Sequence, residues 1–217
     1  DVTESRIDYV WSENDKGDAS FTQYYYNSVG QIAFTITGES REQVENLTTI
    51  TVDTVTTLSA QSLESLLQAN MSIAVYDTTE NRVDHVWSKN ESGNLSFTSY
   101  HYDTLGKLVY TVTGADRTAV ESMVGVTVDN VQILTETDID ALLESGMSIA
   151  VYDTVNSRVD HVWTRSESGE ASFTKYTYST TGKLIFKVTG ATRTEVEALT
   201  GITEANYGTL TNAEVDL

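Results

Sequence analysis

The segment RVDHVW occupies residues 82–87 and recurs unchanged at residues 158–163, while RIDYVW stands at residues 6–11. Successive copies begin 76 residues apart. The segment MSIAVYDT at residues 71–78 recurs at residues 147–154 with the same spacing. A fixed period of this length is typical of repeat architectures, in which like units stack on one another. The sequence therefore predicts that copies of one 76-residue unit fill the chain.

The period divides the chain into three predicted units. Residues 1–70 form a unit whose first strand is missing, residues 71–146 a complete unit, and residues 147–217 a unit whose last helix is truncated. No spacer separates the copies, because Gly146 leads directly into Met147. We therefore expect stacked units, in a window on a longer array or in a subunit whose end units are completed by neighbours.

The middle copy contains four stretches with strand character, over residues 72–76, 83–87, 95–102 and 107–113. They are rich in β-branched and aromatic residues, and apolar side chains alternate along the last of them. Short turns join them, so the stretches predict a four-stranded antiparallel meander.

Helix signals follow the meander in each copy. Ser40 and Thr192 are predicted N-caps with Gln or Glu three residues on, as in a capping box, and Thr135 is the predicted cap of a second helix. A short extended piece is expected between the helices, over residues 126–133. The predicted fold class is therefore α+β: a tandem array of 76-residue units, each a four-stranded antiparallel meander plus two short helices and a short extra strand.

The composition excludes several classes of protein. The chain has 32 acidic and 13 basic residues, a formal charge of −19, no cysteine and no proline. Because a phosphate backbone attracts a basic surface, we expect no nucleic-acid partner. No apolar run approaches the ~20 residues of a membrane span, so we expect no membrane insertion. The lack of cysteine excludes disulfides and thiolate metal sites.

Arginine recurs at two fixed positions of the unit and tryptophan at one. The candidate inter-unit or intra-unit contact residues are Arg6, Arg82, Arg158, Arg41, Arg117, Arg193, Trp11, Trp87 and Trp163. The six arginines could clamp acidic groups of the adjacent unit, for example Glu45, Glu121 and Glu197, or form surface ion pairs within their own unit worth less than about 1 kcal/mol each. The tryptophans are expected in core or inter-unit packing, and the alternative is a face on which sugar rings stack.

The histidine and carboxylate residues do not form a recognisable active site or metal site in the sequence. His85 and His161 are expected at packed, hydrogen-bonded aromatic positions rather than as catalytic bases, because Tyr9 replaces them in the first copy. Asp77 and Asp84, with Glu80 between them, could form a Ca²⁺ site, but the spacing favours solvated turn residues. We therefore predict no catalytic residue, no metal site and no cofactor.

The stretch YHYDTLGKLVYTVTG at residues 100–114 resembles the YD repeat of bacterial Rhs-type and related wall-associated proteins. The shared pattern is Tyr-x-Tyr-Asp, two residues, Gly, and an alternating apolar strand that ends near Gly. Only the middle copy keeps the aspartate, Asp103, which Asn27 and Ser179 replace elsewhere. The resemblance covers about 15 residues of each unit and implies a bacterial extracellular repeat protein.

These observations lead to one main functional hypothesis. We expect a non-enzymatic extracellular structural repeat protein that forms a surface filament, stalk or matrix fibre by stacking or strand pairing of units, with neighbouring repeat units or subunits of its own kind as partners. A preceding strand of the SIAVYD type, in cis or from another subunit, is expected to fill the edge beside residues 6–11. The alternative is a multivalent adhesin that binds carbohydrate or a surface through its aromatic sheet face. An enzyme, such as a glycosidase with two acidic residues, is disfavoured because an active site seldom occurs in three similar copies.

Overall fold

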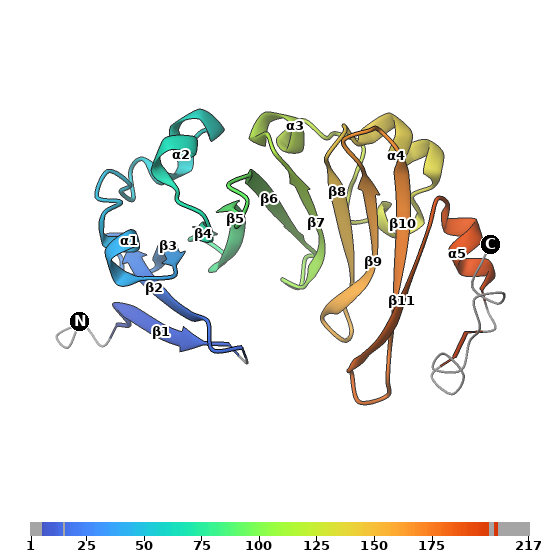
Figure 1. Cartoon of the computed structure of the whole chain (residues 1–217), viewed down its shortest axis with the longest axis horizontal. Coiled ribbons are helices and arrows are strands. Elements are labelled where there is room, and N and C mark those ends of the chain that lie inside the picture. Colours follow the sequence, from blue (N-terminus) through green and yellow to red (C-terminus); the bar gives the residue numbers. More distant parts are fainter. Residues whose placement is uncertain (1–5, 15, 200–201, 204–217) are drawn as a thin grey trace. The chain divides into compact units, whose positions relative to one another are not determined.

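The strands of the protein follow one another in the order of the chain. The computed structural model describes residues 6–14, 16–199 and 202–203. The described strands form one sheet of eleven strands, in which each strand lies beside the next from β1 to β11 (Figure 1). The strands are β1 (Tyr9–Glu13), β2 (Ala19–Tyr26), β3 (Ile32–Gly38), β4 (Met71–Asp77), β5 (Arg82–Lys89), β6 (Leu95–Tyr102), β7 (Leu108–Gly114), β8 (Ser148–Asp153), β9 (Arg158–Arg165), β10 (Ala171–Tyr178) and β11 (Leu184–Gly190).

Short helices connect some of the strands. They are α1 (Arg41–Glu45), the 3-10 helix η1 (Val55–Thr57), α2 (Ala60–Leu66), α3 (Arg117–Glu121), the 3-10 helix η2 (Val131–Ile133), α4 (Glu136–Leu142) and α5 (Arg193–Ala198). The expected capping boxes are confirmed at Ser40 and Thr192, and so is the expected cap at Thr135; each of the three accepts a hydrogen bond from the third helical N–H. Helices this short are marginal alone, so their stability comes from packing on the sheet.

The chain contains two compact units. One comprises residues 1–100 with 113–121, and the other residues 101–112 with 122–217. In the first unit, α1 packs on β2 and β3; in the second, α5 packs on β10 and β11.

The predicted α+β tandem array of 76-residue units, each built on its own four-stranded meander, is wrong, because the sheet does not end within 76 residues. Strand β4 pairs antiparallel on both sides: Val75 lies opposite Phe34 of β3, and Ile73 lies opposite Trp87 of β5. A separate meander would leave a row of unpaired backbone N–H and C=O groups on each of its outer strands. Pairing across the boundary between sequence copies satisfies these groups, and the eleven strands form one continuous sheet.

The extra strand predicted over residues 126–133 is also absent from the described structure. The segment forms turns and the 3-10 helix η2 (Val131–Ile133). Asn130 causes the difference, because its side chain accepts a hydrogen bond from the Thr127 N–H at 2.8 Å and donates one to the Gly125 carbonyl at 2.7 Å. Such local bonds offer the backbone an alternative to a strand ladder.

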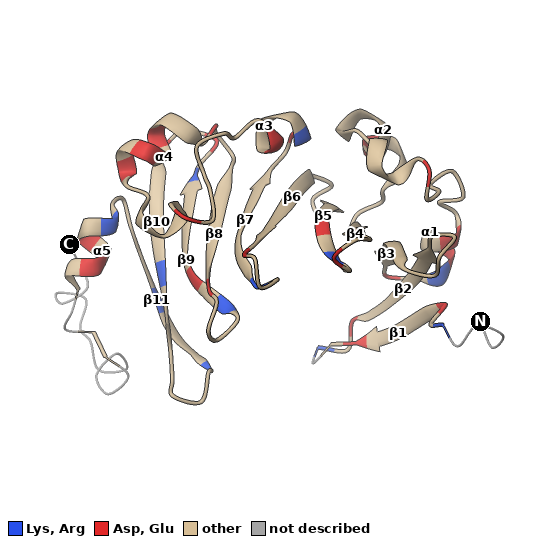
Figure 2. Ribbon diagram, turned by 180° about the vertical axis from the view of Figure 1, so that it is seen from behind, with Lys and Arg blue, Asp and Glu red and all other residues tan. Residues whose placement is uncertain are grey.

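The core of each unit lies where the strands meet the helices. In the first unit Phe34, Ile73 and Leu63 are fully buried, and in the second Ile149 and Ile139 are. Acidic residues occur on α4 and α5 (Figure 2), and among them Asp138 and Glu195 are exposed. None of the helices in the described part of the chain has the length and hydropathy of a membrane span.

Candidate functional site

The outer strand β1 exposes large apolar side chains. Tyr9 is 48 % exposed, Val10 38 % and Trp11 53 %. Among the described residues, β1 pairs with β2 on one side, and no strand lies on its other side. We call this open side, with Tyr9, Trp11 and Glu13, the β1 edge. An open strand edge is a template for pairing with another strand.

The equivalent positions in β5 and β9 are covered. Trp87 and Trp163 are 0 % exposed. The neighbouring strand covers each of them, since Ile73 of β4 lies opposite Trp87 and Ile149 of β8 opposite Trp163. The exposure of Trp11 therefore follows from the missing neighbour, and not from a different motif.

The backbone of the β1 edge also points outward. In β9 the N–H of Arg165 donates to the Met147 carbonyl at 2.8 Å, so this position directs its backbone toward the preceding strand. Glu13 holds the equivalent position in β1. Because backbone groups alternate along a strand, Trp11 and Tyr9 direct their N–H and C=O groups to the same open side.

Aromatic packing holds the β1 edge in place. The buried ring of Phe21, on β2, lies 5.0 Å from the Trp11 ring and 5.5 Å from the Tyr9 ring, measured between centroids. The Arg41 guanidinium lies 5.5 Å from the centre of the Tyr9 ring. Offset ring contacts and cation–π contacts of this kind orient side chains. The two exposed rings therefore present a fixed surface.

The second set of candidate arginines forms the same ion pair three times. Each guanidinium Nε bonds the glutamate four residues on: Arg41 and Arg117 at 2.7 Å, and Arg193 at 2.8 Å. Arg117 also lies over the Phe97 ring and Arg193 over the Phe173 ring. The nearby glutamates that were considered as inter-unit partners thus pair within the same helix.

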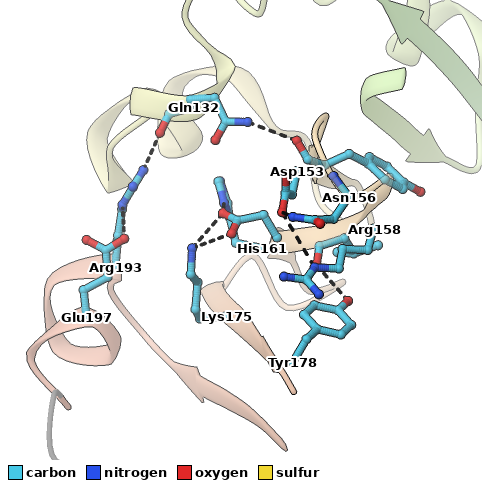
Figure 3. Close-up of polar contacts among 12 residues, drawn as sticks. Gln132, Asp153, Asn156, Arg158, His161, Lys175, Tyr178, Arg193 and Glu197 are labelled. Atoms are coloured by element: carbon cyan, nitrogen blue, oxygen red, sulfur yellow. Dashed lines mark hydrogen bonds and ion pairs between the residues drawn. The ribbon is translucent and has the colours of Figure 1, made fainter. Parts of the chain in front are cut away.

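Two of these arginines additionally bind a distant turn. Arg117 donates to the Thr56 carbonyl at 2.9 Å, and Arg193 donates to the Gln132 carbonyl at 2.8 Å (Figure 3). In each case the carbonyl lies 61 residues earlier in the chain. Within the described residues Arg41 has no such carbonyl, and its side chain is 54 % exposed against 25 % for Arg117 and 26 % for Arg193.

The first set of candidate arginines lies beside tyrosines. The Arg6 guanidinium lies 5.2 Å from the Tyr26 ring centre, and that of Arg158 lies 4.4 Å from the Tyr178 ring centre. Arg158 also approaches Asp153 at 3.7 Å (Figure 3). Arg82 begins β5, opposite Asp77 in the strand register. Arg82 and Arg158 therefore lie beside the first hairpin turn of their sequence copies.

The two histidines of the repeated motif lie in the core. His85 is 2 % and His161 0 % exposed, and they pack on Phe97 and Phe173. Each ring Nδ1 lies 2.7 Å from the carboxylate of the preceding aspartate. The strand register skips that aspartate, so it sits in a β-bulge, a distortion that can re-aim a side chain. This is the arrangement of a packed, hydrogen-bonded aromatic position.

One ion pair of the third sequence copy, between Lys175 and Asp160, was not expected from the sequence. Lys175 on β10 bonds both carboxylate oxygens of Asp160, at 2.7 and 2.8 Å (Figure 3). Burial alone would raise the pKa of Asp160, but the hydrogen bonds from His161 and Lys175 outweigh it and lower this pKa to about 2. The repeat offered no signal for the pair, because Gln23 and Ser99 stand where this copy has Lys175.

The acidic turns do not gather metal ligands. Asp77 accepts the N–H groups of Thr79 and Glu80, and Asp153 those of Val155 and Asn156, as turn residues do. In the described ranges, no three His, Asp or Glu side chains gather in a metal-binding arrangement.

The last strand, β11, forms the other margin of the described sheet. It pairs with β10, and no described strand lies on its other side. Its equivalent β3 pairs with β4 and is largely buried, whereas Leu184, Lys187 and Thr189 of β11 are exposed. Both margins of the sheet thus lack a neighbour of the same kind as β4 and β8.

A scan against protein-family models gives no match, and a search of curated proteins gives no significant match. The sheet margins and the contacts described above are therefore the observations from which a function is inferred.

Proposed function

We propose that this chain is a non-enzymatic structural repeat protein that builds an extracellular filament, stalk or matrix fibre by continuing its sheet into neighbouring units. The observation that carries the proposal is the exposure of Tyr9 and Trp11 on an open strand edge. The equivalent side chains His85 and Trp87 are buried on β5, whose other edge is paired with β4. Because the equivalent side chains lie in the core where a strand such as β4 is present, the exposed pair on β1 is suited to pairing with a strand of the same type.

One type of strand fits both margins of the sheet. On one side β4 packs Val75 and Ile73 opposite Phe34 and Ile36 of β3. The equivalent positions in β11 are Phe186 and Val188. On its other side β4 meets β5, the equivalent of β1. Because β4 and β8 are each already paired on both sides, the strand that joins the β11 margin of one chain to the β1 edge of the next would come from a further repeat unit of the same kind. Head-to-tail contacts of this type can propagate without closing.

The composition and the local resemblance agree with this use. A charge of −19 opposes lateral clumping of a long assembly while its ends remain free to pair. The hairpin over residues 100–114, which resembles the YD repeat, supports an extracellular bacterial setting.

Negative-stain imaging of the native protein tests the proposal. We expect filaments whose length increases with protein concentration, and we expect the variant Trp11→Lys to shorten them because it places a charge on the pairing face. The matched control is Leu105→Lys, a change at a turn residue that is 81 % exposed. Isolated compact particles at all concentrations would contradict the proposal.

The exposed pair of rings also supports a second candidate, a multivalent adhesin. Tyr9 and Trp11 are both about half exposed and lie against the same Phe21 ring. Aromatic rings presented in this way can stack on sugar rings, and many copies would give avidity. Glycan binding that is lost in Trp11→Ala and kept in Leu105→Ala would favour the adhesin.

A further inference from the structure

We infer that the β1 edge is a receptor for one class of ligand: an extended segment with the sequence pattern Met-Ser-Ile-Ala-Val-Tyr of β4 and β8, supplied by a repeat unit of this kind. The inference rests on the proposed function and adds the identity and register of the occupant. It is based on the strands β4 and β8, which pair with the equivalent edges of β5 and β9.

The register follows from the covered copies. On β5, Ile73 lies opposite Trp87, Val75 opposite His85 and Met71 opposite Lys89. When this register is transferred to β1, the isoleucine of the ligand lies opposite Trp11, its valine opposite Tyr9 and its methionine opposite Glu13. A slip of one residue would move all three apolar side chains to the other face, so this register is strongly preferred.

The two faces of the ligand have different requirements. In β4 the side chains of Met71, Ile73 and Val75 are at most 2 % exposed, whereas Ser72 and Ala74 between them are only partly buried. The ligand therefore needs apolar residues at every second position and tolerates small polar residues between them. The outward backbone groups of the β1 edge supply the ladder, as in other cases where a peptide adds a strand to a sheet.

One position distinguishes the β1 edge from its equivalents. Lys89 bonds Glu64 of α2 at 3.1 Å, and Arg165 donates to the Asp140 carbonyl of α4 at 2.8 Å. Glu13 places a negative charge where these two residues are basic. The strand pattern is thus shared with β4 and β8, but the helix that precedes the ligand strand should carry a basic or neutral residue in place of Glu64 or Asp140.

The intrinsic fluorescence of the chain can report the binding. Trp11 is 53 % exposed, and the other two tryptophans, Trp87 and Trp163, are 0 % exposed. The probe is a synthetic peptide of residues 71–78, MSIAVYDT, which contains no tryptophan. We expect a saturable shift of the emission to shorter wavelength as the peptide covers Trp11, and slower hydrogen exchange at the amides of Tyr9, Trp11 and Glu13.

Two altered peptides serve as matched controls. Replacing the apolar pair, Ile73→Ser with Val75→Ser, should abolish the shift, whereas Ala74→Ser on the other face should preserve it. No shift with the unaltered peptide, or equal shifts with all three peptides, would overturn the inference. Peptide binding without filaments would leave the receptor intact and contradict only the filament, and filaments without peptide binding would contradict only the receptor.

Discussion

Strands β1 and β5 contain nearly the same motif in different surroundings. Trp11 in RIDYVW is 53 % exposed, and Trp87 in RVDHVW is 0 % exposed. Both tryptophans contact the phenylalanine opposite them on the following strand, Phe21 and Phe97, at 5.0 and 4.8 Å between ring centroids. The difference is the preceding strand, which β5 has and β1 lacks among the described residues. Burial of this position is therefore determined by the neighbouring strand.

The arginines of helices α1 and α3 also differ in their surroundings. Arg41 and Arg117 form equal ion pairs with the glutamate four residues on, but within the described residues only Arg117 also donates a hydrogen bond to a carbonyl, that of Thr56. Within the described residues, β1 thus pairs with one strand where β5 pairs with two, and Arg41 lacks the carbonyl contact that Arg117 makes. Four experiments on six substitutions can break or sharpen this comparison.

The largest effect is expected from the tryptophans. Trp163→Ala should lower the free energy of unfolding by about 3–5 kcal/mol, because it leaves a large cavity in a packed core. Trp11→Ala, the matched change at the β1 edge, should cost less than about 1 kcal/mol, as surface changes do. Urea unfolding followed by circular dichroism measures both. Equal losses would mean that Trp11 is buried in the isolated chain.

The next effect concerns the arginine that binds a carbonyl. Arg193→Ala removes the bond to the Gln132 carbonyl and the pair with Glu197, and we expect a loss of about 1–2 kcal/mol in the free energy of unfolding. Arg41→Ala removes only the equivalent ion pair and the ring contact, so its loss should be smaller. Thermal unfolding of the two variants would contradict this account if Arg41→Ala were the more destabilised.

Acid should lower the contribution of the Asp160 carboxylate, in the β-bulge of the third copy, to the free energy of unfolding. The pKa of Asp160 falls from the ordinary value of 3.8 to about 2, so its charge stabilises the fold above pH 3.8, and this contribution is lost as the pH falls through 2. For a partly exposed group the loss is about 1 kcal/mol. Lys175→Gln should flatten the decline of stability between pH 4 and pH 2. An unchanged slope in that variant would show that the lysine contributes nothing.

The smallest effect is expected at Glu13. Glu13→Lys restores the basic residue found at Lys89 and Arg165, so it should strengthen association with units that carry an acidic residue like Glu64 or Asp140. The gain should be less than about fivefold in affinity, because exposed ion pairs are weak. Analytical ultracentrifugation in low and high salt checks it. Weaker self-association of the variant at low salt would contradict the register given for the β1 edge.

Local structure could largely be predicted from the sequence. The expected strand ranges 72–76, 83–87, 95–102 and 107–113 overlap β4 to β7 within one to two residues at each end, and the caps at Ser40 and Thr135 form as expected. Period-two patterns and capping residues act through near neighbours, which is why they can be read locally.

Long-range pairing could not be predicted in the same way. The apolar pattern of residues 72–76 is the same whether the strand pairs with one neighbouring strand or with two. The sequence pattern therefore did not reveal that β4 joins two sequence copies in one sheet. The Asn130 side chain turned an expected strand into η2. The β-bulge at Asp160 and its bond to Lys175 depend on a register that no single segment specifies.

Supplying the missing neighbour in cis tests the central claim most directly. In the sequence, Asp1 is equivalent to Asp77, so the six residues Met-Ser-Ile-Ala-Val-Tyr placed before Asp1 would restore the strand in its expected register. The measurement is acrylamide quenching of tryptophan fluorescence. We predict that the extended chain loses the accessible fraction contributed by Trp11 and no longer shifts its emission with the MSIAVYDT peptide, while an extension with serine in place of isoleucine and valine changes neither. A Trp11 that stays as accessible in the extended chain as in the original would contradict the account.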